Sequence, residues 1–172
     1  MERIEDTGVF ELFIPGLAAG CGYMYEIKRQ GKGTTRKLDP VSRQISSVPI
    51  IASVVSDENM PDSYAWNDGL WMIKRKKEAG KKKPVTVYEV SLTDWLKEKS
   101  ADELVDFVKQ EGYTHVCFLP VAEYLNEEMN GYSTLGYFAV THRIGGSDAF
   151  KKLVDDCHNA GIGVIMDWNG AY

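Results

Sequence analysis

Three short apolar segments in the second half of the chain constrain its fold more than any other feature. They cover residues 85–92, 113–120 and 163–167, and each is rich in Val, Ile, Leu or aromatic side chains. Strands this apolar, alternating with helices, are typical of a parallel sheet covered by helices. Helix signals and one long connection separate them, so the predicted order is strand, helix, strand, loop, helix, strand.

The first predicted helix begins at Ser100. Ser100 and Glu103 have the spacing of a capping box, in which the hydroxyl accepts from the glutamate N–H and the carboxylate accepts in return. Gly112 stands where a left-handed residue ends a helix. The buried stripe expected between them is Leu104, Val105 and Val108, with Phe107 at its edge.

The second predicted helix follows a loop over residues 121–146. We expect Ser147 to cap this helix, with Asp148 favourable in its first turn and Gly161 at its end. Its inner face would be Phe150, Leu153, Val154 and Cys157.

The first half of the chain has the pattern of short strands separated by turns. Residues 8–14 alternate and end at a Pro-Gly turn, residues 23–37 predict a hairpin with its tip near Gly31, and residues 47–55 are a third β-rich stretch. Such strands favour a β-sandwich, and three or four of them make only part of one.

Charge divides the chain near residue 84. Residues 1–84 have a balance of +3 and residues 85–172 a balance of −8. The basic run over residues 74–84 is interpreted as a solvated linker or helix end, because it has no interleaved aromatic residues to stack bases. We therefore assign residues 1–56 to the partial sandwich, 57–84 to a linker and 85–172 to the β/α part.

Composition excludes several functional classes. The net charge of −5 argues against nucleic acid as a partner. The apolar runs fall short of the roughly 20 residues that a membrane span needs. The polar, acidic start is no secretory signal, so a cytoplasmic protein is expected. No metal or other cofactor is expected, because the histidines and cysteines lack ligand spacing. Reduced, buried thiols are predicted for Cys21, Cys117 and Cys157.

Candidate site residues lie at the carboxyl ends of the predicted strands, where parallel β/α folds bind ligands. Asp167 directly follows the third strand, and an ionised carboxylate without a partner in a dry core would cost several kcal/mol. It either points into a polar cleft or bonds to backbone at the strand end, and both alternatives stay open here. Aromatic residues that suit a sugar platform, or ordinary loop packing, gather at the same rim: Trp95, Tyr124, Tyr132, Tyr137, Trp168 and Tyr172.

Ordered motifs run along the chain from about residue 8 to residue 172. They include Gly-Val-Phe-Glu-Leu-Phe-Ile-Pro-Gly-Leu from residue 8, Tyr-Ala-Trp-Asn-Asp-Gly-Leu-Trp-Met from residue 64, Thr-His-Val-Cys-Phe-Leu-Pro-Val-Ala-Glu from residue 114, and Asp-Cys-His-Asn-Ala-Gly-Ile-Gly-Val-Ile-Met-Asp-Trp from residue 156. This series resembles 1,4-α-glucan (glycogen) branching enzymes of the α-amylase family. The resemblance implies a partial, immunoglobulin-like, carbohydrate-binding β-sandwich followed by the first β-α-β-α-β portion of a (β/α)8 TIM barrel.

The resemblance also implies an activity. Branching enzymes are glycosyltransferases of glycogen biosynthesis that transfer α-1,4-glucan segments to form α-1,6 branches. They use a retaining double displacement with a nucleophilic carboxylate, an acid/base carboxylic acid and a third acidic residue. All three follow later barrel strands, so no catalytic residue is expected in this chain, which would be inactive alone. The implied partner is α-glucan, as glycogen or maltooligosaccharide.

Three substrate-binding positions carry over from the resemblance. Tyr132 matches the tyrosine that stacks on the sugar at the cleavage point, and Asp167 matches the aspartate that opens the first conserved region. Tyr172 stands where that region ends in a sugar-binding histidine. Other departures are Ser91 for a histidine, Ser133 for a glutamine, and Asn169-Gly170 for Val-Pro.

Three interpretations remain. The chain is a truncated piece of a branching enzyme, a non-catalytic glucan-binding or partner-binding protein derived from one, or a subunit that completes its barrel with a separate remainder. Three barrel strands cannot close and would leave an open edge. Self-association, a partner or marginal folding is therefore predicted.

Overall fold

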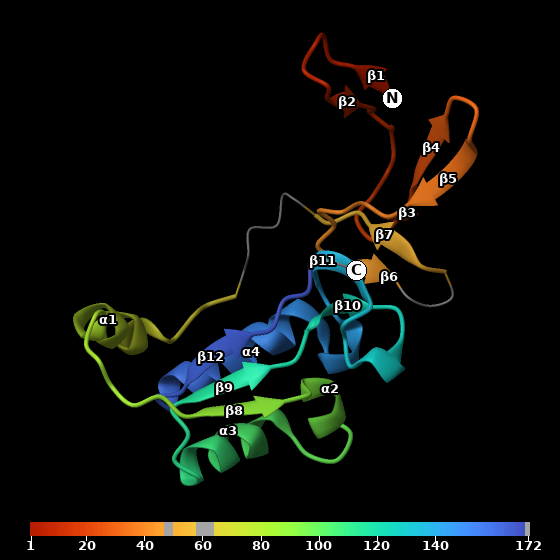
Figure 1. The fold of residues 1–172 in the computed structure, drawn as a ribbon. Helices are drawn as coiled ribbons and strands as arrows, with labels where there is room; N and C mark the ends of the chain where they lie inside the picture. Colours follow the sequence, from red (N-terminus) through yellow and green to blue (C-terminus); the bar gives the residue numbers. More distant parts are fainter. Residues whose placement is uncertain (47–49, 58–63, 171–172) are drawn as a thin grey trace.

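Three parallel strands organise the second half of the chain. The computed structural model describes residues 1–46, 50–57 and 64–170. Strands β8 (Val87–Val90), β9 (His115–Phe118) and β12 (Gly163–Met166) form one sheet in the order β12-β9-β8, with both pairings parallel (Figure 1). The predicted parallel sheet is confirmed, and each strand is shorter than its apolar segment.

Helices cover one face of this sheet. Helix α2 (Leu92–Trp95) and helix α3 (Ala101–Gln110) connect β8 to β9, and helix α4 (Gly146–Asn159) precedes β12. The side chains of Val116 and Phe118 are fully buried against them. The core also contains Leu92, Leu104, Val105, Val108, Val121, Ile144, Phe150, Leu153, Cys157 and Ile162. The inner faces predicted for both long helices are confirmed.

The other face of the sheet is exposed along its alternate positions. Val87 and Ile165 are 43% and 41% exposed, and Glu89, two residues after Val87 on the same strand, is exposed too. Because strand side chains alternate, the sheet is apolar and covered on one side and accessible on the other.

The predicted capping box of α3 is confirmed. The Glu103 N–H donates to the Ser100 hydroxyl over 3.2 Å, and the Ser100 N–H donates to the Glu103 carboxylate over 2.7 Å. Gly112 has φ +78°, the left-handed conformation expected after the last turn.

Two expectations for residues 121–147 are wrong. The segment treated as a long loop contains an antiparallel hairpin of β10 (Ala122–Tyr124) and β11 (Thr134–Val140), with one-turn 3-10 helices over Glu127–Met129 and His142–Ile144. Helix α4 begins at Gly146 after Gly145, whose φ is +88°, so Ser147 lies inside the first turn instead of capping it. Asp148 does lie in that turn, as predicted.

Three small antiparallel sheets lie in the described part of residues 1–57. The hairpin of β4 (Tyr25–Arg29) and β5 (Gly33–Lys37) is confirmed, with its tip at residues 30–32. The predicted strand over residues 8–14 is wrong in extent. Only β2 (Phe10–Glu11) pairs, with β1 (Glu2–Arg3), and Phe13 is 86% exposed.

The third sheet has the order β3-β7-β6 and is better buried. It joins β3 (Gly22–Tyr23), β7 (Ala52–Val54) and β6 (Ile45–Ser46). All three residues of β7 are buried, as is Ile45. Part of the predicted β-rich stretch, residues 47–49, lies outside the described residues.

A helix lies within the range assigned as linker. Helix α1 (Gly69–Glu78) places Arg75, Lys76 and Lys77 in its last turn, where cations interact favourably with the helix dipole. The basic run is thus a helix end in part, one of its two predicted interpretations. Among the described residues, no helix has the length and apolarity to cross a membrane.

The two serines assigned as helix caps give a matched test. Replacing Ser100 with Ala removes the two hydrogen bonds of its hydroxyl, which accepts from the Glu103 N–H and donates to the Glu103 carboxylate, and should lower the free energy of unfolding by about 1 kcal/mol. Replacing the exposed Ser147 with Ala should change it by less than about 0.5 kcal/mol. Urea unfolding followed by circular dichroism measures both, and equal losses for the two variants would contradict the assigned helix starts.

Candidate functional site

Tyr132 and Asp167 meet at the carboxyl end of the parallel sheet. Asp167 directly follows β12, and its N–H donates to the carbonyl oxygen of Phe118 over 2.9 Å, which extends the ladder by one residue. The Tyr132 hydroxyl donates to Oδ2 of Asp167. Both residues are half-buried. The carboxylate therefore faces a loop hydroxyl and not only backbone, and two of the three predicted site residues lie together.

Asn169 and Thr134 hold the backbone around this pair. The side-chain amide of Asn169 donates to the carbonyl oxygen of Tyr132 over 2.8 Å, and the Thr134 hydroxyl donates to the Asn169 carbonyl over 3.3 Å. Sequence reasoning noted Asn169 only as a departure from a family pattern. Its place two residues beyond Asp167 was the available signal. Tyr172, the third predicted residue, lies outside the described residues.

The electrostatics of the pair make Tyr132 a hydrogen-bond donor. Its hydrogen bond to the Asp167 carboxylate, assisted by desolvation, raises the pKa of the Tyr132 phenol to about 12. Ionising the phenol would place a second negative charge beside the carboxylate. At neutral pH the ring is therefore uncharged, and this site can orient a ligand but has no phenolate base to offer.

The aromatic side chains of Tyr137 and of Trp168, which directly follows Asp167 in the chain, form an accessible platform. Tyr137 and Trp168 have ring centroids 5.8 Å apart, and the Trp168 indole N–H donates to the Tyr137 carbonyl over 3.3 Å. Trp168 remains 56% exposed. An exposed aromatic face next to a carboxylate suits a ligand with apolar C–H faces and hydroxyl edges.

Two other aromatics predicted at the rim serve ordinary packing. Trp95 packs against Phe107 at 5.7 Å between ring centroids, with the Lys99 ammonium over its ring. Tyr124 is buried beneath the Arg143 guanidinium. Of the two predicted roles, a sugar platform or ordinary packing, Trp95 and Tyr124 have the second.

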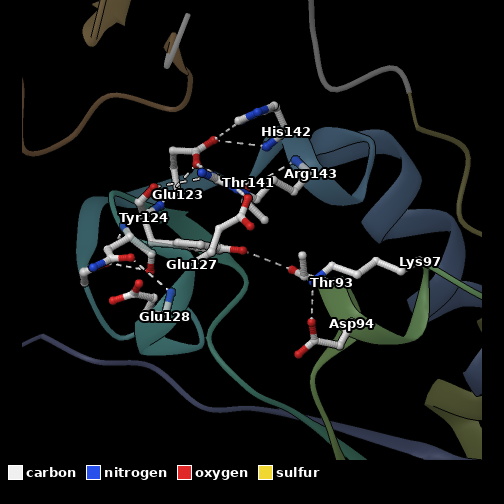
Figure 2. A network of polar contacts seen from close by, with 12 residues as sticks. Thr93, Asp94, Lys97, Glu123, Tyr124, Glu127, Glu128, Thr141, His142 and Arg143 are labelled. Carbon is white, nitrogen blue, oxygen red and sulfur yellow. Dashed lines mark hydrogen bonds and ion pairs between the residues drawn. The ribbon is translucent and has the colours of Figure 1, made fainter.

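A buried carboxylate fixes the base of the hairpin that leads to Tyr132. Glu123 is 1% exposed, and Figure 2 shows polar groups converging on it from the end of β11 and the turn that follows. Arg143 Nη1 lies 2.7 Å from Oε1, and the Thr141 hydroxyl donates to the same oxygen over 3.1 Å. His142 contributes its backbone N–H at 3.0 Å and its ring Nδ1 at 2.9 Å to Oε2.

Sequence reasoning missed this network. Glu123 and Arg143 are 20 residues apart, and no periodic pattern connects them. The available signal was a carboxylate within an otherwise apolar Pro-Val-Ala segment, which required a cationic partner elsewhere.

Two serines that depart from the family's pocket pattern have structural partners. The Ser133 hydroxyl, fully buried, accepts from the Asn126 N–H over 2.8 Å and so braces the hairpin connection. The Ser91 hydroxyl accepts from the Asp94 N–H over 3.3 Å at the start of α2. Ser91, but not Ser133, also lines a polar pocket with Thr93, Asp94, Lys97, Glu127 and Asn130, among others.

The cysteines are free thiols in three environments. Cys157 is buried, and burial raises the pKa of its thiol to about 12. Cys117 is half-buried, and desolvation raises its pKa as well. Cys21 is exposed, so the prediction of a buried thiol is wrong there, because the strand ends around it leave its side chain uncovered.

Comparison with known proteins supplies the family context. Residues 100–169 match the family model described as alpha amylase, catalytic domain. The 1,4-alpha-glucan branching enzyme GlgB of Methylococcus capsulatus is 41% identical over 96% of this chain and 23% of its own length. The enzyme of the same name from Gloeobacter violaceus is 40% identical over the whole of this chain and 25% of its own length.

A solved structure shares the fold. The crystal structure of a putative alpha amylase from Salmonella typhimurium matches with a TM-score of 0.68 and 24% identity, over 96% of this chain and 27% of that one. The resemblance to branching enzymes and to the α-amylase family is thus confirmed, and this chain spans about a quarter of the length of these relatives.

The Tyr132–Asp167 contact should make the free energy of unfolding depend on pH in the alkaline range. The folded chain keeps a proton that an unfolded tyrosine loses near pH 10, so the contact's contribution is complete below about pH 10 and declines as pH rises toward 12. Tyr132→Phe should lower the free energy of unfolding by about 1.5–3 kcal/mol at neutral pH. It should also remove the titration near pH 12 from the carbon-13 spectrum of Cζ-labelled tyrosines.

Asp167→Asn is the matched variant for this titration. It keeps the shape of the side chain but removes its charge, so the pKa of Tyr132 should fall toward the ordinary tyrosine value. A Tyr132 resonance that titrates near pH 10 in the unaltered chain would contradict the assigned contact.

Proposed function

We propose that this chain is part of a 1,4-α-glucan branching enzyme and that Tyr132 and Asp167 form part of its glucan site. The observation that carries the proposal is the contact between these residues at the carboxyl end of the sheet, with the Tyr137–Trp168 platform beside it. Identity of about 40% to branching enzymes over nearly the whole chain supports the choice of α-glucan as the ligand.

The proposal extends to the architecture. Residues 1–56 would belong to an immunoglobulin-like, carbohydrate-binding β-sandwich, residues 57–84 to the connection, and residues 85–172 to the first β-α-β-α-β portion of a (β/α)8 barrel. The parallel sheet supports this assignment, because helices cover one of its faces while Val87 and Ile165 on the other are accessible, as the interior face of an incomplete barrel would be.

Within that architecture Tyr132 and Asp167 would bind and orient glucan. The neutral ring of Tyr132 presents a flat apolar face to a sugar, while its hydroxyl stays engaged with Asp167. The second oxygen of the carboxylate can accept a hydrogen bond from a sugar hydroxyl. Bond cleavage and transfer would depend on a nucleophilic carboxylate and an acid/base carboxylic acid, which in this family follow later barrel strands.

A second candidate is a non-catalytic glucan-binding or partner-binding protein derived from a branching enzyme. The observation that favours it is that Ser91 and Ser133, at two pocket positions of the family, bond to neighbouring backbone N–H groups. The accessible sheet face would then pair with a second copy or with a separate remainder of the barrel, and sedimentation velocity at two concentrations would detect the self-association.

Glucan binding can be measured through the tryptophan at the site. Titrating residues 1–172 with maltoheptaose should give a saturable change in tryptophan fluorescence, because a sugar stacked beside Trp168 displaces water from its exposed ring. Trp168→Phe should abolish most of the change, and Tyr132→Ala should weaken binding by roughly tenfold. Trp66→Phe is the control, since Trp66 lies in the connector next to Tyr64.

The same sample of residues 1–172 also tests whether the chain forms branches by itself, which neither candidate predicts. Incubated with amylose, residues 1–172 should form no α-1,6 linkages detectable by proton NMR, because the catalytic carboxylates are not expected among them. Branch formation would refute that expectation, and the absence of saturable binding up to millimolar sugar would refute the glucan site in both candidates.

A further inference from the structure

One side chain from the first half of the chain enters a hollow in the hairpin that leads to Tyr132. Strand β6 lies against β11, and Ile45 on β6 is only 5% exposed (Figure 1). A Cβ atom placed on Gly136 of β11 would lie 2.3 Å from Cδ1 of Ile45 and 3.2 Å from its Cγ1. The two residues therefore fit together as a knob and a hole.

Position 136 requires glycine because a Cβ atom would have no room there, and not because of its backbone conformation. Its φ lies outside the left-handed region that disfavours other residues. Glycine in a strand interior weakens the strand and often marks a close approach of another group. Here the approaching group is Ile45, and the Cβ of Ala139 would be the next neighbour at 3.3 Å.

The elements on both sides of this contact are firmly held. Ile45 pairs with Ser53 of β7, which is fully buried within the β3-β7-β6 sheet. Gly136 lies opposite Glu123 in the β10–β11 hairpin, so it belongs to the segment that the buried carboxylate network holds in place. The same strand begins at Thr134, two residues after Tyr132.

We propose that Ile45 is a positioning residue whose side chain docks the β3-β7-β6 sheet onto the hairpin at Gly136 and thereby holds Tyr132 against Asp167. The docking surface is thus the Gly136 hollow, and its partner is the first half of the same chain. The contact is independent of any ligand, whereas its consequence for sugar binding rests on the function proposed above.

Hydrogen exchange measured by mass spectrometry tests the docking without glucan. Gly136→Ala should push Ile45 out of the hollow and speed exchange in peptides from residues 122–140 by at least about tenfold, while residues 101–110 of α3 stay protected. Adding Ile45→Ala to Gly136→Ala removes the clashing carbons, and exchange in the double variant should be no faster than in Gly136→Ala, because both changes act on the same contact. Gly22→Ala is the matched control, because its Cβ would meet Ala52 at an ordinary 3.4 Å.

Ile45→Ala alone keeps the test decisive if Gly136→Ala does not fold, since it removes the knob without adding a clash. The carbon-13 Cζ resonance of Tyr132, identified by its absence in Tyr132→Phe, should shift in Ile45→Ala and return toward its original position in Ile45→Val. Exchange within about twofold of the unaltered chain in both single variants, or effects of the two changes that simply add in the double variant, would overturn the proposal. Glucan binding does not enter this result, so its failure and that of the proposed function are distinguishable.

Discussion

The buried carboxylate of Glu123 is the interaction on which the arrangement of the site depends. An ionised carboxylate removed from water costs several kcal/mol unless its oxygens are paired and hydrogen-bonded. Arg143 supplies the opposite charge at 2.7 Å, and Thr141 and His142 occupy the remaining acceptor positions. The start of β10 and the end of β11 therefore cannot separate without exposing a charge in an apolar setting.

This constraint extends to Tyr132 through the hairpin. With its base fixed at Glu123, the hairpin closes through Ser133, whose carbonyl oxygen accepts from the Leu125 N–H over 2.9 Å. Tyr132 directly precedes Ser133 and reaches Asp167 at the end of β12. A residue on a long connection thus acquires a defined position relative to a sheet strand, which an orienting ring in a binding site needs.

A second buried carboxylate orders the region around helix α4. Asp155 of α4 is 3% exposed and accepts from the Asn67 N–H at 3.0 Å and from the Tyr64 hydroxyl at 3.1 Å. One turn later, His158 Nδ1 lies 2.8 Å from Asp68, and Trp71 stacks on the imidazole. The connector is therefore held against α4 by hydrogen bonds and an aromatic contact.

The features that depend on residues close together in the sequence were predictable. The capping box at Ser100, the apolar stripe of α3 and the three parallel strands depend on short-range spacing and were predictable. Asp167 was predictable as a site candidate because it directly follows a strand of apolar residues. The start of α4 was missed because the left-handed Gly145 replaces a serine cap, a choice that spacing does not reveal.

The other features were not predicted because they depend on contacts between residues far apart in the sequence. The β10–β11 hairpin has two register irregularities, so it shows no clean alternation in the sequence. Glu123 finds Arg143 across that hairpin, and Gly136 is explained only by Ile45, which is 91 positions earlier in the chain. Each contact depends on residues that only the folded chain brings together.

A double-mutant cycle between Glu123 and Tyr132 tests most directly whether the buried carboxylate holds the site together. The free energy of unfolding would be measured for the unaltered chain, Glu123→Gln, Tyr132→Phe and the double variant. If the hairpin transmits the constraint, the two losses should fall short of additivity by about 0.5–3 kcal/mol. Losses that add within about 0.3 kcal/mol would show the two residues to be independent and would contradict the account.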